Sequence, residues 1–137
     1  MSVEDPLRLT GESQAHPPVL LIADDDEDIL NLVQLRLSRS GFDVVVARDG
    51  EEALRLARER CPDLAVLDWM MPKLNGIDVL RGMRSGGETA QIPVILLTAR
   101  VSEADVAEGL AAGADGYITK PFSPQELASR VRAILEG

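Results

Sequence analysis

Short apolar runs and longer amphipathic stretches alternate along the chain. The runs lie at residues 19–23, 44–47, 64–67, 94–97 and 116–119. Continuous apolar runs of this length are typical of strands buried on both faces of a sheet. After each run, apolar residues recur every three or four positions, as Leu30, Val33 and Leu37 do, which predicts one amphipathic helix after each strand.

Capping residues mark where several of the predicted helices begin. Asp49, Asn75 and Ser102 each stand directly before a helical stretch, where a side-chain oxygen can accept a backbone N–H. The stretch Ser-Pro-Gln-Glu at residues 123–126 predicts a capping box with proline at the first helical position. These signals separate the helices from the strands that precede them.

Five strands that alternate with five helices predict an α/β domain. The right-handed crossovers favour a parallel sheet with helices on both faces, a flavodoxin-like (βα)5 fold of strand order 2-1-3-4-5. The helix after Ser102 would have Val106 and Leu110 as its apolar positions. A single domain over residues 19–137 accounts for the pattern, and residues 1–18, which lack a sustained period, are expected to form a flexible tail.

Composition narrows the classes of function. The net charge of −9, from 23 acidic and 14 basic residues, disfavours direct nucleic-acid binding. No apolar run approaches the ~20 residues of a transmembrane helix, and the acidic first residues lack the basic start of a signal peptide. Cys61 is the single cysteine, so no internal disulfide can form. We therefore expect a soluble cytoplasmic domain that binds neither nucleic acid nor membrane.

Polar residues stand at the carboxyl ends of the predicted strands. Asp24 and Asp25 follow the first strand, and Asp68 follows the third. Because these two strands flank the switch point of the fold, the carboxylates are expected to converge, and their repulsion favours a hard cation such as Mg²⁺. Thr98 and Lys120 follow the fourth and fifth strands. A carboxylate, a cation, a hydroxyl and a lysine are the components of phosphoryl transfer to an aspartate.

The sequence around these positions resembles the receiver domain of bacterial response regulators, the CheY-like superfamily of two-component signalling. Four motifs carry the resemblance: Leu-Ile-Ala-Asp-Asp-Asp at 21–26, Asp-Leu-Ala-Val-Leu-Asp-Trp-Met-Met-Pro-Lys-Leu-Asn-Gly at 63–76, Leu-Thr-Ala at 97–99, and Gly-Ala-Asp-Gly-Tyr-Ile-Thr-Lys-Pro-Phe at 113–122. They occur in the order of the family, one at each functional strand end. The resemblance extends from Val19 to about Leu135.

The resemblance implies a role for each site residue. Asp68 would accept the phosphoryl group from a sensor histidine kinase or a phosphotransfer protein. Mg²⁺ would be bound directly by Asp25, Asp68 and the backbone carbonyl of Met70, and by Asp24 through a water molecule. Lys120 would pair with the phosphoryl oxygens, and the peptide bond after it is expected to be cis. Such a domain is not an enzyme, because it catalyses only its own phosphorylation and dephosphorylation.

The resemblance also implies how the switch is read. Thr98 would turn towards the phosphoryl group and Tyr117 would turn inward behind it. The change would reach the face formed by the last strand and the helices on either side of it, where a homodimer forms on phosphorylation in related receivers. Packing alone is the other interpretation of Tyr117.

Some positions depart from the pattern of receivers that dimerise through this face. Val106 and Glu108 stand where basic residues are common, and Gly116 replaces a frequent aspartate. These departures leave the homodimer open. The resemblance further implies that Met70 and Arg100, two residues beyond Asp68 and Thr98, would flank the path of the hydrolytic water and set the lifetime of the phosphorylated form.

Two other functions compete with that of a phosphorylatable receiver. A haloacid-dehalogenase-type phosphatase needs a second aspartate at the position of Met70, and a cap for its substrate that this chain is too short to supply. A degenerate receiver, binding partners without phosphorylation, would not need the whole set of site residues. Among the neighbouring residues, 26–28 are interpreted as a solvated helix start, Trp69 as packing beside the site, and Cys61 as a passive side chain.

Overall fold

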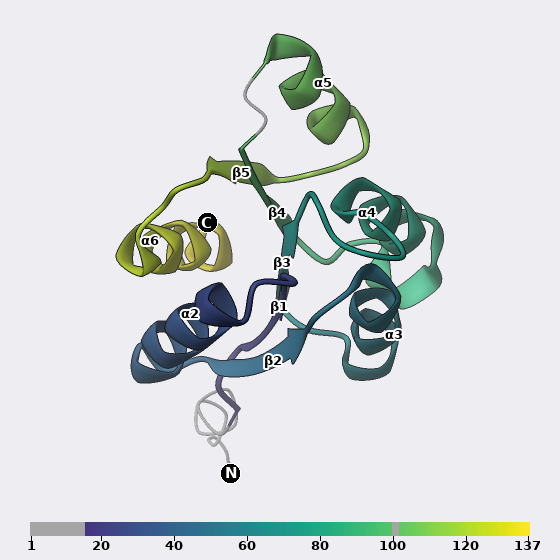
Figure 1. Cartoon of the computed structure of the whole chain (residues 1–137). Coiled ribbons are helices and arrows are strands. Elements are labelled where there is room, and N and C mark those ends of the chain that lie inside the picture. The colour runs from purple at the N-terminus through teal and green to yellow at the C-terminus, as the bar shows by residue number, and fades with distance from the viewer. Residues whose placement is uncertain (1–15, 100–101) are drawn as a thin grey trace, which may run out of the picture.

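The computed structural model describes residues 16–99 and 102–137 and contains one five-stranded parallel sheet (Figure 1). The strands are β1 (Val19–Ala23), β2 (Asp43–Ala47), β3 (Leu64–Asp68), β4 (Val94–Thr98) and β5 (Gly116–Thr119). Their order, β2-β1-β3-β4-β5, confirms the flavodoxin-like topology expected from the sequence. The predicted tail falls largely outside the described residues, which begin at His16.

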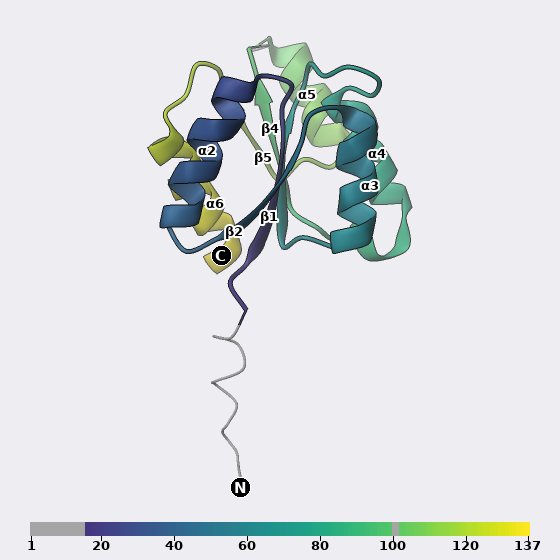
Figure 2. The same ribbon diagram turned by 60° about the horizontal axis from the view of Figure 1, so that its bottom comes forward.

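Helices cover both faces of the sheet. They are α2 (Glu27–Arg39), α3 (Gly50–Arg60), α4 (Gly76–Ser85), α5 (Glu103–Ala111) and α6 (Pro124–Glu136), with a short 3-10 helix, η1 (Gly87–Thr89), that the sequence pattern did not predict. Figure 2 shows α2 and α6 on one face and α3 and α4 on the other. Within the described residues, no helix is long and apolar enough to cross a membrane.

Alternate residues of the strands contribute to two separate cores. In β1, Leu20 and Ile22 pack with α2 and α6, whereas Leu21 and Ala23 pack with α3 and α4. All five residues of β3 and of β4 are buried, which explains why these strands appear in the sequence as continuous apolar runs. The sheet is therefore a rigid platform for the polar residues at its carboxyl edge.

The predicted caps are present at the starts of the helices. Asp49, Asn75 and Ser102 each accept a hydrogen bond from the first turn of the helix that follows. Ser123 accepts a hydrogen bond from the Glu126 N–H at 3.0 Å, which is the serine half of the capping box predicted there. The reciprocal box forms instead at Asn75, where both halves are present.

The helix α5 packs against the sheet through a glycine. Leu110, one of its predicted apolar positions, is 55% exposed, and Val106 is half-buried. Gly109 is the buried residue of this helix: a Cβ there would lie 3.1 Å from Leu96 Cδ1 and 3.7 Å from Trp69 Cζ3. Because the helix backbone approaches the sheet at Gly109, the side chain of Leu110 lies on the solvent side.

Candidate functional site: an acidic pocket at the carboxyl edge of the sheet

Three carboxylates converge where β1 and β3 end. Asp24 follows β1 and is fully buried, Asp68 ends β3 and is 4% exposed, and Asp25 is exposed at the mouth. One carboxylate oxygen from each lies within 4.8 Å of the others. The convergence expected from the strand order is thus present, because β1 and β3 are neighbours in the sheet.

Lys120 lies beside two of these carboxylates. Its Nζ is 3.1 Å from Asp24 Oδ2 and 3.2 Å from Asp68 Oδ1. The Lys120 backbone N–H donates to the carbonyl of Thr98 at 2.8 Å, which ties the end of β5 to the end of β4. The peptide bond between Lys120 and Pro121 is cis, as the resemblance implied. We refer to Asp24, Asp25, Asp68 and Lys120 as the acidic pocket.

The pKa values of Asp68 and Lys120 are both raised, for different physical reasons. Burial raises the pKa of Asp68 to about 6, the neighbouring Asp24 carboxylate adds to the rise, and Lys120 opposes it. Burial lowers the pKa of Lys120, but its hydrogen bond to Asp24 and the two negative charges outweigh burial, so the net pKa is raised. The lysine therefore stays charged, and the carboxylates lack a full counter-charge.

The donor set fits a hard divalent cation. Three carboxylates face a single ammonium group, and all the metal-ligating atoms that they offer are oxygens. Oxygen donors of this kind suit Mg²⁺, whereas thiolate and imidazole sites suit softer metals. The cluster of Asp24, Asp25 and Asp68 could hold such an ion. Asp24 also accepts hydrogen bonds from Lys120 and from the Asp26 N–H at 3.0 Å.

The loop after β3 is held at both of its ends. The Trp69 N–H donates to the Leu97 carbonyl at 2.8 Å, and the Gly76 N–H donates to the Trp69 carbonyl at 2.8 Å. A Cβ at Gly76 would lie 2.6 Å from the Asp68 carbonyl oxygen, so this position has no room for a side chain. The Met70 side chain is 64% exposed at the rim of the pocket.

The two predicted switch residues occupy different environments. Thr98 ends β4 and is 2% exposed. Tyr117, in β5, is half-buried and lines a narrow hollow between α5 and the sheet, together with Trp69 and Leu96. Trp69 packs in the core, as expected. Arg100, expected to influence the lifetime of the phosphorylated form, lies outside the described residues.

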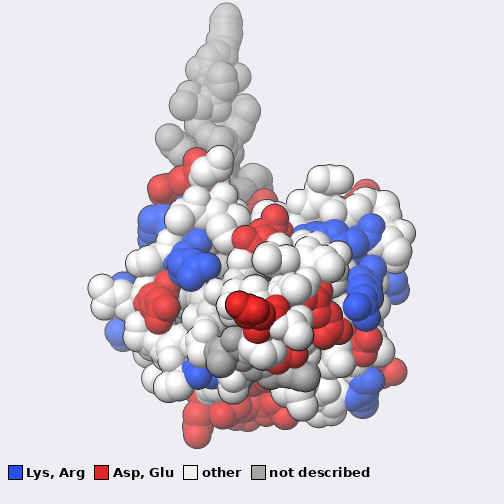
Figure 3. Space-filling model, turned by 90° about the horizontal axis from the view of Figure 1, so that it is seen from above, with Lys and Arg blue, Asp and Glu red and all other residues white. Residues whose placement is uncertain are grey.

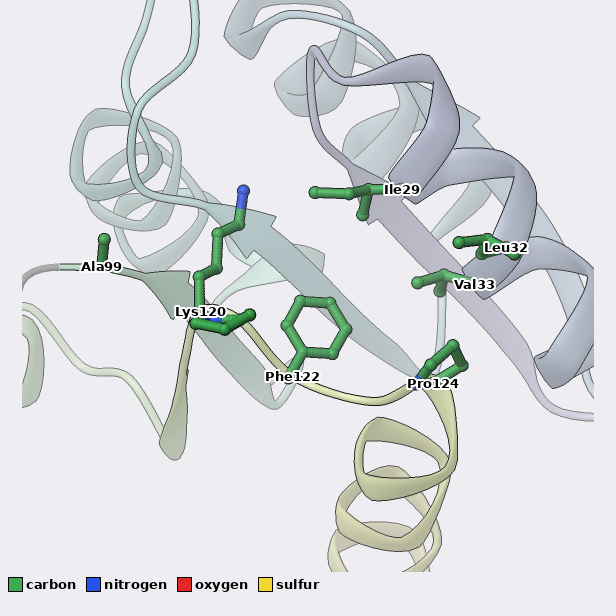
Figure 4. A pocket seen from close by; sticks show the side chains of 8 residues that line it. Ile29, Leu32, Val33, Ala99, Lys120, Phe122 and Pro124 are labelled. Atoms are coloured by element: carbon green, nitrogen blue, oxygen red, sulfur yellow. The ribbon is translucent and has the colours of Figure 1, made fainter.

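An apolar groove of about 440 Å³ opens beside the acidic pocket, and the sequence patterns did not reveal it. Figure 4 shows Ile29, Leu32 and Val33 of α2 facing Phe122 and Lys120 across it. Leu32 is 57% exposed. The sequence signal was an apolar residue on the outer side of a helix, which periodicity alone does not distinguish from an ordinary surface position.

The chain matches the response regulator receiver domain over residues 20–132. It is 51% identical over 116 residues, 85% of this chain, to the alkaline phosphatase synthesis transcriptional regulatory protein PhoP of Bacillus subtilis, of which it covers 48%. It has the same identity and coverage with the transcriptional regulatory protein CpxR of Escherichia coli. The chain thus spans about half the length of these relatives.

Solved structures agree in fold. The receiver domain of the Francisella response regulator 1452 is 42% identical, with a TM-score of 0.81 over 87% of this chain and 97% of that one. The receiver domain of a Pseudomonas aeruginosa sensor histidine kinase, solved with a magnesium ion in its active-site cleft, is 26% identical, with a TM-score of 0.81 over 88% and 99%. This chain therefore belongs to the response regulator receiver domain family.

Proposed function

We propose that the domain accepts a phosphoryl group onto Asp68 from the phosphohistidine of a sensor histidine kinase or phosphotransfer protein. The observation that carries this proposal is the position of Lys120, whose Nζ contacts both Asp24 and Asp68 in a pocket that also holds Asp25. An aspartate in a water-poor pocket with a fixed cation beside it is suited to attack phosphorus. Transfer would break the N–P bond of the donor and form an acyl phosphate on Asp68.

Each residue of the pocket has a part in this reaction. Asp25, Asp68 and the carbonyl of Met70 would hold Mg²⁺ directly, and Asp24 would hold it through water. Bound Mg²⁺ would neutralise charge on the phosphoryl oxygens. Lys120 would move from its carboxylate partners to a phosphoryl oxygen. The chemistry is self-modification, and hydrolysis of the acyl phosphate would reset the domain.

The apolar groove beside Lys120 suits the docking of the phosphodonor protein. It runs from α2 to the segment after β5, and Lys120 forms part of its lining (Figure 4). A partner that covered Ile29, Leu32 and Phe122 would place its phosphohistidine over the mouth of the acidic pocket. Apolar grooves with a few polar groups at one end are typical protein-binding sites.

The output would be read at α5, β5 and α6, through Thr98 and Tyr117. Figure 3, seen from the side of α5, shows acidic side chains over the middle of this face and basic ones towards its flanks. The helix α5 itself carries Glu103, Asp105 and Glu108 and no lysine or arginine. A homodimer through this face would have to match the acidic residues of α5 with basic residues of the second copy. We expect the domain to act in the reducing environment of the cytoplasm.

Trp69 offers a test, because it directly follows Asp68 and is buried next to α5. We expect its fluorescence to change on addition of Mg²⁺ and to change further with beryllofluoride, an analogue of the phosphoryl group. The Asp68→Asn variant should lack the second change. Equal responses of the variant and the wild type would favour a degenerate receiver, which binds partners without phosphorylation.

A further inference from the structure

The N-terminus of α3 forms the support of the loop that follows β3. The Gly50 N–H donates to the Pro72 carbonyl at 3.2 Å, at the apex of this loop. Behind Pro72, the Leu74 N–H donates to the same carbonyl at 2.8 Å. The loop is thus fixed at its apex by α3, in addition to the two bonds of Trp69 at its base.

Gly50 has no room for a side chain. A Cβ there would lie 1.9 Å from the Leu74 carbonyl oxygen, 2.5 Å from Leu74 Cβ and 2.6 Å from the Leu74 carbonyl carbon. Two of these three atoms belong to the backbone, so a rotamer change cannot relieve the overlap. Gly50 is the first residue of α3, with no positive φ, so the requirement is one of space rather than of conformation.

A surface lysine adds to the same contact. Lys73, at the tip of the loop, adopts φ +73 and its Nζ lies 3.7 Å from Asp49 Oδ2 and 3.8 Å from Glu51 Oε1, both at the start of α3. These ion pairs are exposed, so each contributes little to stability. Both ion pairs nevertheless connect the tip of the loop to the start of α3.

We propose that Gly50 is a positioning residue for the Mg²⁺ site, acting through the backbone of this loop. Met70 lies between the base held at Trp69 and the apex held at Pro72, so the direction of its carbonyl depends on both anchors. The inference rests on the proposed function, in which that carbonyl ligates Mg²⁺. A side chain at position 50 would push the apex outward and displace the backbone of Met70, whose carbonyl is the proposed third protein ligand.

The test compares Gly50→Ala with Gly87→Ala, the same change at a position where a Cβ would meet nothing within 4 Å. Mg²⁺ affinity is measured from Trp69 fluorescence and, independently, from the rise in unfolding temperature that Mg²⁺ produces over EDTA. We expect Gly50→Ala to bind Mg²⁺ roughly tenfold more weakly than wild type, as is usual when a group supporting a metal ligand is disturbed. Gly87→Ala should bind it as the wild type does.

The outcomes separate this inference from the proposed function. A wild type without any Mg²⁺ response overturns both. A responsive wild type with equal Mg²⁺ affinity in the two glycine variants overturns the inference alone, even where Gly50→Ala melts at a lower temperature in EDTA. If Gly50→Ala does not fold in buffer, both glycine variants are compared in trimethylamine N-oxide, which favours the folded state. Weaker Mg²⁺ binding by Gly50→Ala than by Gly87→Ala then supports the inference, and equal binding overturns it.

Discussion

The loop after β3 and the helix α5 both lie next to Trp69, the neighbour of Asp68, yet they are attached to the sheet in opposite ways. The loop contacts its neighbours through backbone atoms at Gly50 and Gly76, where no side chain fits. The helix α5 buries only Gly109 among its described residues and leaves a hollow above Trp69 and Tyr117. The metal-binding side is therefore tied down by backbone contacts, whereas the helix on the side that would transmit the signal buries little of its own surface.

The attachment of α5 is concentrated at its C-terminal end. The guanidinium of Arg84 donates to the Gly113 carbonyl at 2.8 Å and to the Ile92 carbonyl at 2.7 Å, and it pairs with Asp115 at 3.0 Å. The N-terminal end of α5 follows Thr98 and the residues at 100–101. In the proposed switch, Thr98 would displace one end of the helix while Arg84 holds the other.

The largest effect is expected on the rate of phosphorylation, from a substitution in the acidic pocket. Lys120→Met removes the cation that contacts Asp24 and Asp68 and should slow phosphorylation by acetyl phosphate by about 100-fold, the usual cost of one electrostatic contact in a transition state. Mg²⁺ binding, followed by Trp69 fluorescence, should be retained or strengthened. Wild-type phosphorylation rates in this variant would remove Lys120 from the mechanism.

Two glycine variants compare the loop after β3 with the helix α5 directly. Gly76→Ala places a Cβ 2.6 Å from the Asp68 carbonyl oxygen and should cost about 3 kcal/mol in the free energy of unfolding. Gly109→Ala meets the flexible end of Leu96 at 3.1 Å and gains helix propensity, so its cost should stay within about 1 kcal/mol. Urea unfolding measures both, and equal costs would contradict the comparison.

The pKa of Asp68 predicts how stability depends on pH in the absence of Mg²⁺. A folded-state pKa of about 6, above the usual 3.8, means that the folded protein binds this proton more tightly than the unfolded chain does. The contribution of Asp68 to stability is therefore greatest below pH ~4 and is lost as the pH rises through about 6. Asp68→Asn should be more stable than wild type by roughly 2 kcal/mol at pH 7.5, with the difference vanishing near pH 4. A difference in stability that does not change with pH would contradict the raised pKa of Asp68.

The Arg84 contact should be weaker but measurable. Arg84→Met leaves the carbonyls of Gly113 and Ile92 without this donor and should cost about 1–2 kcal/mol. Arg81→Met is the matched control in the same helix, because Arg81 is exposed and makes one ion pair with Glu108 at 3.8 Å. Calorimetry should find little change in the control. Equal losses would show that Arg84 does not hold α5.

The sequence predicted the parts of the molecule that depend on the chemical type of the side chains. Asp24, Asp68 and Lys120 were predicted to meet because each follows a predicted strand at its carboxyl end. The order of those strands follows from the alternation of strands and helices along the chain. The outward position of Leu110 was not predictable, because a helix that approaches a sheet through glycine does not follow its apolar period. Nor was the contact of Gly50 with Leu74, since an overlap with a backbone carbonyl leaves no pattern in the sequence.

The most direct test of the account is the location of the phosphoryl group. After reaction with acetyl phosphate and Mg²⁺, borohydride reduces an acyl phosphate to an alcohol and so converts the modified aspartate into homoserine, which peptide mass spectrometry locates. The account expects homoserine at position 68, and none in chains that were not exposed to acetyl phosphate. Homoserine at another aspartate, or undiminished phosphorylation of Asp68→Asn, would contradict it.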